Sequence, residues 1–258
     1  MSLSKHINDD LPHAVAELAD GLVTSGILPG VSVLVLQDTD EVLYHEAGLR
    51  DVARARPMTR DAIFRLFSMT KPVTAAAVMA LVDEGLIGLQ DPLGDWVPEL
   101  ADLRVHPGSG GGMSVPAHPA RIQHLLTHTA GFSYWFHPRH AVAALYADDP
   151  GIGVHERWRF DPALGGLDGL AESLARLPLV AQPGEKWHYS MAFEVAGMVV
   201  ERAAGQPLDK FMAKRLFEPL GMKDTAFSVP PGDADRLASL YGPGAASNCW
   251  KAGTRALW

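Results

Sequence analysis

Residues 73–82 form an almost wholly apolar run that directly follows a proline, Pro72. The run is apolar on every face of a helix, which is typical of a helix buried inside a protein. It is too short to span a bilayer, which requires about 20 residues. Proline is tolerated only in the first turn of a helix, so this helix is predicted to begin just before Pro72. The rest of the chain must therefore supply a body that surrounds it.

The chain is long enough to bury such a helix, because 258 residues suffice for one large domain or two small ones. The start, MSLSKHINDD, has neither the apolar core nor the cleavage site of a signal peptide, so a cytoplasmic location is expected. The net charge of −8 argues against binding to nucleic acid or to an anionic membrane. The single cysteine, Cys249, excludes an internal disulfide.

Helical and strand patterns alternate with turn residues along the chain. Apolar spacing predicts a helix over 11–22, and the runs at 31–36 and 42–45 predict a β-hairpin. Later helices are expected at 120–128, 138–147, 167–177, 189–204 and 207–217. The long connections at 102–118 and 148–166 are expected to be functional or mobile. Because an isolated hairpin is marginally stable, further strands or a covering helix are required.

A serine and a lysine, Ser68 and Lys71, lie three residues apart at the start of the apolar helix. Residues at i and i+3 share one face of a helical turn. A serine hydroxyl becomes an effective nucleophile when a neighbouring base takes its proton. Desolvation and the positive potential of a helix N-terminus disfavour a charged ammonium, which suits a neutral or proton-sharing lysine. The alternative is that Ser68 caps the helix and Lys71 extends into solvent.

The sequence argues against two other catalytic arrangements. No G-x-S-x-G motif is present, which argues against an α/β-hydrolase triad. His124 and His128 are four residues apart but lack the glutamate and the third ligand of a zinc site, so packing and capping roles are expected. No metal or cofactor is expected.

Five segments follow one another along the chain: SMTKPVTAAAVMALVDEG, LQDPLGDWVPEL, IQHLLTHTAGF, QPGEKWHYSMAFEVAGMVVE and FEPLGMKDTAF. Together they resemble the β-lactamase-related serine hydrolases, a superfamily that includes class C β-lactamases, DD-peptidases and family VIII carboxylesterases. The resemblance covers about residues 28–241. It implies an α+β fold, in which an α/β sandwich with an antiparallel sheet adjoins an all-helical region.

The resemblance also implies catalytic roles. In that family the S-x-x-K serine is acylated and the lysine assists its deprotonation, which assigns these roles to Ser68 and Lys71. The family's catalytic tyrosine corresponds to Tyr189, which follows the Pro183-Gly184 turn and precedes an apolar-periodic helix. Its phenol is therefore expected at the boundary of an element, facing a cleft. The alternative is a tyrosine packed in an interface.

The residue two positions after Tyr189 bears on the expected substrate. β-Lactamases and DD-peptidases carry an asparagine there that binds the substrate amide, whereas this chain has Met191. The resemblance is therefore greatest to family VIII esterases and implies a small-molecule ester substrate, with a class C-like β-lactamase or DD-peptidase as the alternative. Tyr134 matches a pocket tyrosine of the esterases. Trp135 and Phe136 would add apolar wall, and aromatic core packing is the alternative for this stretch.

The end of the chain departs from the family pattern. Relatives carry a K-T-G-like strand far downstream of the tyrosine, which completes the sheet and supplies an oxyanion donor, whereas this chain stops resembling them after Gly242. Lys251-Ala252-Gly253 lies too close to Tyr189 to be that strand. We therefore expect an N-terminal helix and hairpin (1–66), a mainly helical part with both motifs (67–235) and an atypical or truncated tail (236–258). A truncated, poorly active product is the second hypothesis.

Overall fold

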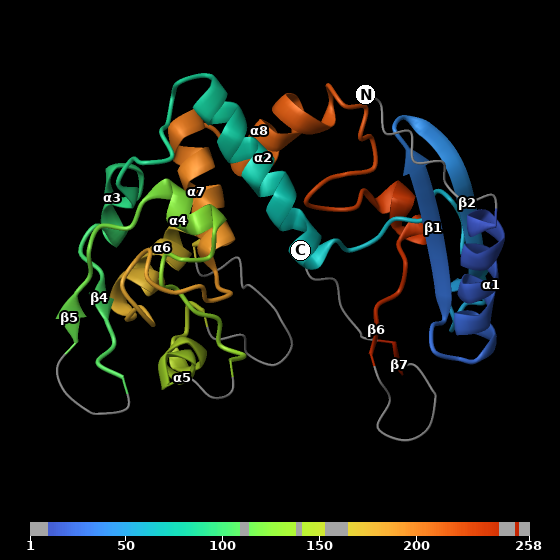
Figure 1. Ribbon diagram of the computed structural model, residues 1–258, viewed down its shortest axis with the longest axis horizontal. Coiled ribbons are helices and arrows are strands. Elements are labelled where there is room, and N and C mark those ends of the chain that lie inside the picture. The colour runs from blue at the N-terminus through green and yellow to red at the C-terminus, as the bar shows by residue number, and fades with distance from the viewer. Residues whose placement is uncertain (1–9, 109–113, 138–140, 153–164, 243–250, 253–258) are drawn as a thin grey trace. The chain divides into compact units, whose positions relative to one another are not determined.

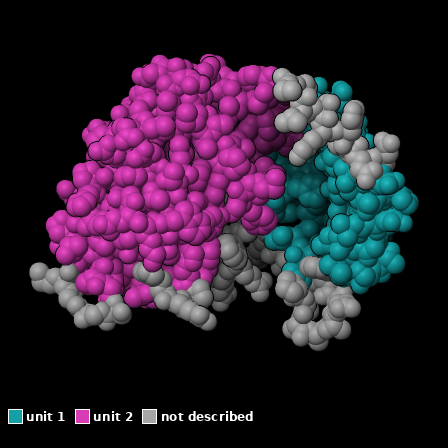
Figure 2. Space-filling view, viewed as in Figure 1, with its two compact units in different colours: residues 1–65, 228–256 teal, residues 66–227, 257–258 magenta. Residues whose placement is uncertain are grey.

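The structure, a computed structural model, describes residues 10–108, 114–137, 141–152, 165–242 and 251–252. The chain divides into two compact units (Figure 2). Unit 1 comprises residues 1–65 and 228–256, and unit 2 comprises residues 66–227 and 257–258. Unit 1 contains the larger sheet, and unit 2 contains most of the helices.

Unit 1 is built on a three-stranded antiparallel sheet of order β1-β2-β3. Its strands are β1 (Gly30–Gln37), β2 (Asp40–Asp51) and β3 (Arg56–Pro57). β1 and β2 form the hairpin that the sequence predicts, with a register shift between Val35 and Leu36. In the turn, Asp38 has a φ of 55°, in the left-handed region that aspartate tolerates better than most residues.

Helix α1 (Leu11–Thr24) packs against β2 and β1 (Figure 1). Side chains alternate along β1, where Val33 and Val35 are partly buried while Leu34 and Leu36 are exposed on the opposite face. A covering helix and a third strand therefore supply the support that an isolated hairpin lacks.

A second stretch of unit 1 returns to the N-terminal part of the chain. The 3₁₀ segment η5 (Pro231–Arg236) ends where Leu237 forms a parallel bridge with Ile63. Farther along, β6 (Tyr241–Gly242) pairs antiparallel with β7 (Lys251–Ala252). Between them, Ser239 N–H donates to the carbonyl oxygen of Arg50 on β2 at 2.9 Å, so the sheet gains a contact from residues that follow most of the helices in sequence.

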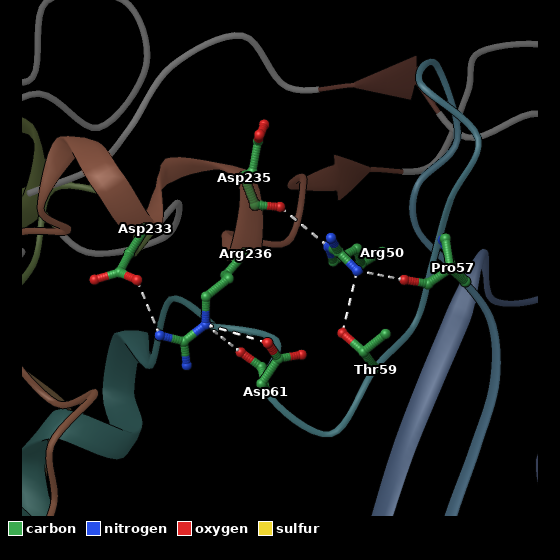
Figure 3. Close-up of polar contacts among 7 residues, drawn as sticks. All are labelled: Arg50, Pro57, Thr59, Asp61, Asp233, Asp235 and Arg236. Atoms are coloured by element: carbon green, nitrogen blue, oxygen red, sulfur yellow. Dashed lines mark hydrogen bonds and ion pairs between the residues drawn. The ribbon is translucent and has the colours of Figure 1, made fainter.

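Arg50 and Arg236 bind the stretch at 231–242 to the N-terminal part of unit 1 (Figure 3). Arg50, on β2, donates from Nε to the carbonyl oxygen of Asp235 at 3.2 Å. Arg236 lies 3.5 Å from Asp61 Oδ2 through Nε and 3.1 Å from Asp233 Oδ1 through Nη1. The contacts of Arg50 with Asp235 and of Arg236 with Asp61 join residues 50–61 to residues 235–236. They therefore stabilise the association of two stretches that are far apart in sequence.

Unit 2 is mainly helical, with one short strand pair. Its first elements are η1 (Phe67–Met69), α2 (Thr70–Asp83), α3 (Leu93–Trp96), η2 (Pro98–Leu100), β4 (Arg104–Val105) and β5 (Val115–Pro116). Its later elements are α4 (Ile122–Leu126), α5 (Ala141–Asp148), α6 (Gly166–Arg176), α7 (Ala192–Ala204), α8 (Leu208–Met212) and the π-helical turn η4 (Ala213–Phe217). Residues 138–140 of the helix predicted at 138–147 lie outside the described residues. The α+β class with antiparallel sheets is confirmed.

The core of unit 2 forms around α7, which packs against α2, α4, α6 and α8 (Figure 1). Val195, Val199 and Val200 on this helix are fully buried. A Cβ at Gly197 would come within 2.9 Å of Leu208 Cδ2, so the glycine allows α8 to approach α7 closely. The segment before α7 is thereby fixed against the rest of unit 2.

Helix α2 differs from the sequence expectation of burial on every face. Ala77, Val78 and Leu81 share one face and are fully buried, whereas Met79 is 38% exposed. The expectation was wrong because much of the run is alanine, as at exposed Ala76, and a methyl group loses little free energy by remaining in water. An apolar sequence on all faces therefore does not require burial on all of them.

The connection at 102–118 also differs from the long loop that the sequence predicts. Its ends form the antiparallel pair of β4 and β5, and Val105 makes a parallel bridge with Leu179. Strands of two residues are too short to show a periodic pattern, so the sequence does not reveal them. Residues 109–113 and 153–164 of the two predicted connections lie outside the described residues.

Candidate active site

Ser68 and Lys71 lie at the N-terminal end of α2. Ser68 is in the 3₁₀ turn η1, immediately before the N-cap residue Met69, and it is exposed. Lys71 lies in the first helical turn and donates from Nζ to Ser68 Oγ at 3.3 Å. The two side chains therefore contact each other, as their i, i+3 spacing predicts.

The residue before Ser68 has a backbone conformation that side chains rarely adopt. Phe67 has a φ of 47°, in the left-handed region. For a residue other than glycine this costs of order 1–3 kcal/mol, and such strain is concentrated at functional sites. The conformation forms the sharp turn that leads into α2 with the Ser68 side chain at the surface.

Tyr189 reaches the same serine from the segment that precedes α7. Its Oη lies 2.5 Å from Ser68 Oγ, although 121 residues separate the two in sequence. They meet because α2 and α7 pack side by side (Figure 1). The structure thus brings Ser68, Lys71 and Tyr189 into one cluster, and Tyr189 lies two residues before Met191, the N-cap residue of α7, rather than at the first residue of the helix predicted at 189–204. Their chemical roles stay predictions.

Lys71 lies against the rings of two tyrosines. Its Nζ is 4.9 Å from the ring centroid of Tyr189 and 5.6 Å from that of Tyr134. An aromatic face attracts a cation within about 6 Å of its centroid. The two rings therefore hold the lysine head group in place beside Ser68.

Hydrogen bonds join the loop at 133–137 to the segment that carries Tyr189. Met191 N–H donates to the Ser133 carbonyl at 3.3 Å, and His137 Nε2 donates to the Tyr189 carbonyl at 2.7 Å. His188 Nε2 lies 3.1 Å from Ser133 Oγ. Because a carbonyl oxygen only accepts, a proton must be on Nε2 of His137. These bonds fix the main chain on both sides of the Tyr189 side chain.

His128 supports this segment through its ring. Its Nδ1 accepts a hydrogen bond from Ser190 N–H at 3.3 Å, and its ring centroid lies 4.8 Å from that of Tyr189. Burial lowers the pKa of His128 to about 4, and the positive charge of Lys71 acts in the same direction. His128 is therefore neutral at pH 7, with its proton on Nε2. Packing is the role that the sequence predicts for it.

Tyr134 is the second tyrosine beside the lysine, and it is 5% exposed. Its hydroxyl donates to Glu194 Oε1 at 2.8 Å, and its ring stacks on Phe136 with centroids 4.7 Å apart. Burial, reinforced by the Glu194 carboxylate, raises the pKa of Tyr134 above its usual value. Burial also raises the pKa of Glu194, against the opposing effect of the Lys71 charge. Tyr134 therefore keeps its proton at neutral pH.

The residues predicted to bind substrate lie in two different environments. Tyr134 and Trp135 belong to the aromatic cluster, with ring centroids 5.5 Å apart, and Trp135 is partly exposed. Met191 is the N-cap residue of α7 and is fully buried in the core of unit 2. Tyr134 thus lies beside the cluster of Ser68, Lys71 and Tyr189, and Trp135 lies next to Tyr134. A contact of each with substrate stays a prediction.

Glu194 is a residue of this site that the sequence motifs do not include. Its signal was an acidic residue in an otherwise apolar helical run, AFEVAGMVV, because a carboxylate on a buried face needs a polar partner. His137 and His188 showed no such signal. Their partners are a carbonyl and a hydroxyl in loops, which residue spacing does not predict.

Within the described ranges, no three His, Cys, Asp or Glu side chains gather in a way that could hold a metal ion. In the same ranges no helix has the length and apolar character needed to cross a bilayer.

Comparison with known proteins gives a consistent family. The sequence profile described as Beta-lactamase matches residues 15–256. An uncharacterized protein of Mycobacterium tuberculosis is 39% identical over 84% of this chain and 52% of its own length. Esterase EstB of Burkholderia gladioli is 40% identical over 83% of this chain and 50% of its own length. The chain therefore spans about half the length of the curated relatives it matches.

The fold is similar to that of a solved structure, EstCE1, described as a hydrolase with promiscuous acyltransferase activity. The two superpose with a TM-score of 0.77 at 28% sequence identity, over 91% of this chain and 57% of that chain. The chain is thus also shorter than this structural relative.

Proposed function

The chain belongs to the Beta-lactamase family, and on this premise we propose that it is a serine hydrolase that cleaves short-chain carboxylic esters through an acyl-enzyme on Ser68. The observation that carries the proposal is the contact of Ser68 Oγ with both Lys71 Nζ, at 3.3 Å, and Tyr189 Oη, at 2.5 Å. A hydroxyl within hydrogen-bond reach of groups that accept and return a proton is the arrangement that nucleophilic catalysis needs.

In the acylation step, Ser68 Oγ attacks the carbonyl carbon of the ester. Its proton passes to the Tyr189–Lys71 pair, which returns it to the oxygen of the leaving alcohol. The ester C–O bond breaks, the alcohol departs, and the acyl group stays on Ser68. The positive potential at the start of α2 and the lysine ammonium stabilise the negative charge that develops on the carbonyl oxygen.

In the deacylation step, a water molecule attacks the acyl carbon on the exposed side of Ser68. The same tyrosine–lysine pair takes the proton of the water and returns it to Ser68 Oγ as the acyl bond breaks. The carboxylic acid is released and the serine is regenerated. The Tyr189–Lys71 pair therefore serves both half-reactions, because the second is the reverse of the first with water in place of the alcohol.

Three observations support an ester rather than a lactam or a peptide. Met191 stands where β-lactamases and DD-peptidases carry an amide-binding asparagine. The aromatic cluster of Tyr134, Trp135 and Phe136 suits a short apolar acyl group. Among the relatives, EstB is called an esterase and EstCE1 a hydrolase with acyltransferase activity. β-Lactamase or DD-peptidase activity is the alternative.

The first test is hydrolysis of p-nitrophenyl butyrate by the full chain and by Ser68→Ala, with Ser25→Ala on the surface of unit 1 as the matched control. We expect Ser68→Ala to lose on the order of 10³-fold or more in kcat, and the control to keep its rate. Labelling with a fluorophosphonate should add one adduct, located on Ser68 by peptide mass spectrometry. Equal hydrolysis by wild type and Ser68→Ala would refute the proposal.

Two further measurements separate the alternatives. A chromogenic cephalosporin turned over faster than the ester would favour the β-lactamase alternative. A burst of one p-nitrophenol per chain followed by arrest would show acylation without deacylation. This is the result expected if the chain is a poorly active form of such an enzyme. Steady ester turnover with little cephalosporin hydrolysis is the result we expect.

A further inference from the structure

The hydrogen bond between Tyr134 and Glu194 joins the loop at 133–137 to the first turn of α7. The phenolic oxygen donates to Glu194 Oε1 at 2.8 Å. The other carboxyl oxygen, Oε2, is buried and has no hydrogen-bond partner among the described residues. A buried carboxyl group with one unpaired oxygen destabilises a fold, so its presence calls for a reason other than stability.

The Tyr134 phenol that Glu194 holds adjoins the cluster of Ser68, Lys71 and Tyr189. The ring centroid of Tyr134 lies 5.6 Å from Lys71 Nζ and 5.4 Å from the ring centroid of Tyr189. Tyr134 thus contacts both groups proposed to move the proton of Ser68. A hydrogen bond to its phenolic oxygen fixes the position of the far end of the side chain, so the ring stays beside Lys71.

The charges of Lys71 and Glu194 also indicate a link between these two residues through Tyr134. Lys71 and the Glu194 carboxyl interact across Tyr134, because the lysine charge opposes the burial that raises the pKa of Glu194. Lys71 makes no ion pair within 4.0 Å with a carboxylate of the described residues. Tyr134 therefore lies between a buried acid and the lysine, in contact with both.

We propose that Glu194 is a positioning residue for the proton-transfer pair: its hydrogen bond to Tyr134 holds that ring against Lys71 and keeps the lysine in line with Ser68 and Tyr189. The inference rests on the proposed function and names a residue on which the same site depends. Glu194 itself does not touch substrate. It acts through Tyr134.

The decisive variant is the double substitution Tyr134→Phe/Glu194→Met. Replacing both members of a buried hydrogen bond by apolar groups of similar shape is nearly neutral or stabilising for a fold. We therefore expect an unfolding midpoint in urea equal to or above that of wild type. For ester hydrolysis we expect kcat to fall roughly 10- to 100-fold with KM little changed, because a misplaced catalytic group costs rate rather than affinity.

The conservative variant Glu194→Gln tests the hydrogen bond itself. Its amide oxygen accepts the Tyr134 hydroxyl, so it should keep kcat within roughly threefold of wild type, whereas Glu194→Met should not. Tyr44→Phe is the matched control, because it also removes a tyrosine–glutamate hydrogen bond, that of Tyr44 with Glu46 Oε2, but on the sheet of unit 1. It should leave kcat unchanged.

The outcomes are distinct. Unchanged kcat in a folded double variant, with active wild type, overturns the inference and leaves the proposed function standing. The inference is also overturned if kcat falls equally in Glu194→Gln and Glu194→Met, or if it falls only in proportion to lost stability. A wild-type chain that neither hydrolyses p-nitrophenyl butyrate nor takes up the fluorophosphonate label on Ser68 overturns both.

Discussion

Ser68 Oγ and Tyr189 Oη lie 2.5 Å apart, and both are hydroxyl oxygens. One hydroxyl must donate and the other accept, so a single proton occupies the space between them. Lys71 Nζ donates to Ser68 Oγ from the helix side, at 3.3 Å. The serine hydroxyl is thus within hydrogen-bond reach of both groups, and Tyr189 makes the shorter contact.

We therefore predict that Tyr189→Phe lowers kcat for p-nitrophenyl butyrate by about 10²–10⁴-fold, because a positioned acid/base group contributes that much. The ring and its packing against His128 remain, so KM and the unfolding midpoint should change little. Steady-state kinetics and urea unfolding measure both effects. Tyr44→Phe, which removes a phenolic oxygen from the sheet of unit 1, is the control. A Tyr189→Phe rate within a factor of about two of wild type would contradict the assigned role.

A second prediction concerns the turn before Ser68. Because Phe67 has a φ of 47°, a β-branched residue there is more strained than asparagine, which tolerates the left-handed region. Phe67→Val should lower the free energy of unfolding by about 1–2 kcal/mol relative to Phe67→Asn. It should also reduce kcat, since relaxing the turn moves Ser68. Equal stability and equal kcat for the two variants would show that the turn does not depend on this conformation.

The parts of the site that sequence reasoning reached are those that depend on local geometry. Ser68 and Lys71 are three residues apart on one helical turn, so their contact follows from helix periodicity alone. Tyr189 was assigned through the family resemblance. The bond from Tyr134 to Glu194 joins residues 60 apart and depends on how a loop packs against α7, which no local pattern encodes.

In the fold, too, local sequence patterns predict some elements, whereas others depend on tertiary contacts. The β1–β2 hairpin and the helices α4 to α8 follow from periodic apolar residues bounded by glycine and proline. The β4–β5 pair and the bridge between Ile63 and Leu237 are too short for a periodic signal, so tertiary contacts alone determine them. The exposed side of α2 was missed for a different reason. Much of its apolar run is alanine, whose methyl group loses little free energy by remaining in water, so apolar character alone does not require burial.

A third prediction follows from the neutral His128. An unfolded chain has a histidine pKa of about 6.5, whereas burial lowers the pKa of folded His128 to about 4. Between these values the unfolded state binds more protons, so the free energy of unfolding decreases as pH falls from about 6.5 to about 4 and is fully retained above that window. The loss attributable to His128 is on the order of 3 kcal/mol.

Urea unfolding of wild type and His128→Gln at several pH values across this window measures the effect. The variant should be less stable than wild type at neutral pH, because it repacks around the Ser190 N–H, and should lose less stability as the pH falls. His13→Gln, on the exposed surface of α1, is the control and should follow wild type. Parallel pH profiles for wild type and His128→Gln would mean that His128 does not contribute to the acid sensitivity.

The last prediction compares two glycines that share a left-handed backbone. Gly131 has a φ of +89°, and a Cβ there would lie 2.5 Å from the Ala181 carbonyl oxygen. Gly85 has a φ of +69°, and a Cβ there would meet nothing within 4 Å. Gly85→Ala should therefore cost only the conformational term, about 1–2 kcal/mol of unfolding free energy. Gly131→Ala should cost roughly 1–3 kcal/mol more, because backbone must shift to relieve the contact.

The shift at Gly131 should also reach the site. The Gly131 carbonyl accepts from Val180 N–H at 2.7 Å, and the loop at 133–137 follows directly. Gly131→Ala should therefore reduce ester turnover at temperatures where the protein is still folded, whereas Gly85→Ala should not. Urea midpoints and kcat for the two variants provide the comparison. Similar losses of stability in both variants would show that residues 179–181 move to accommodate the added methyl group. The close approach of Gly131 to Ala181 would then not constrain the loop at 133–137.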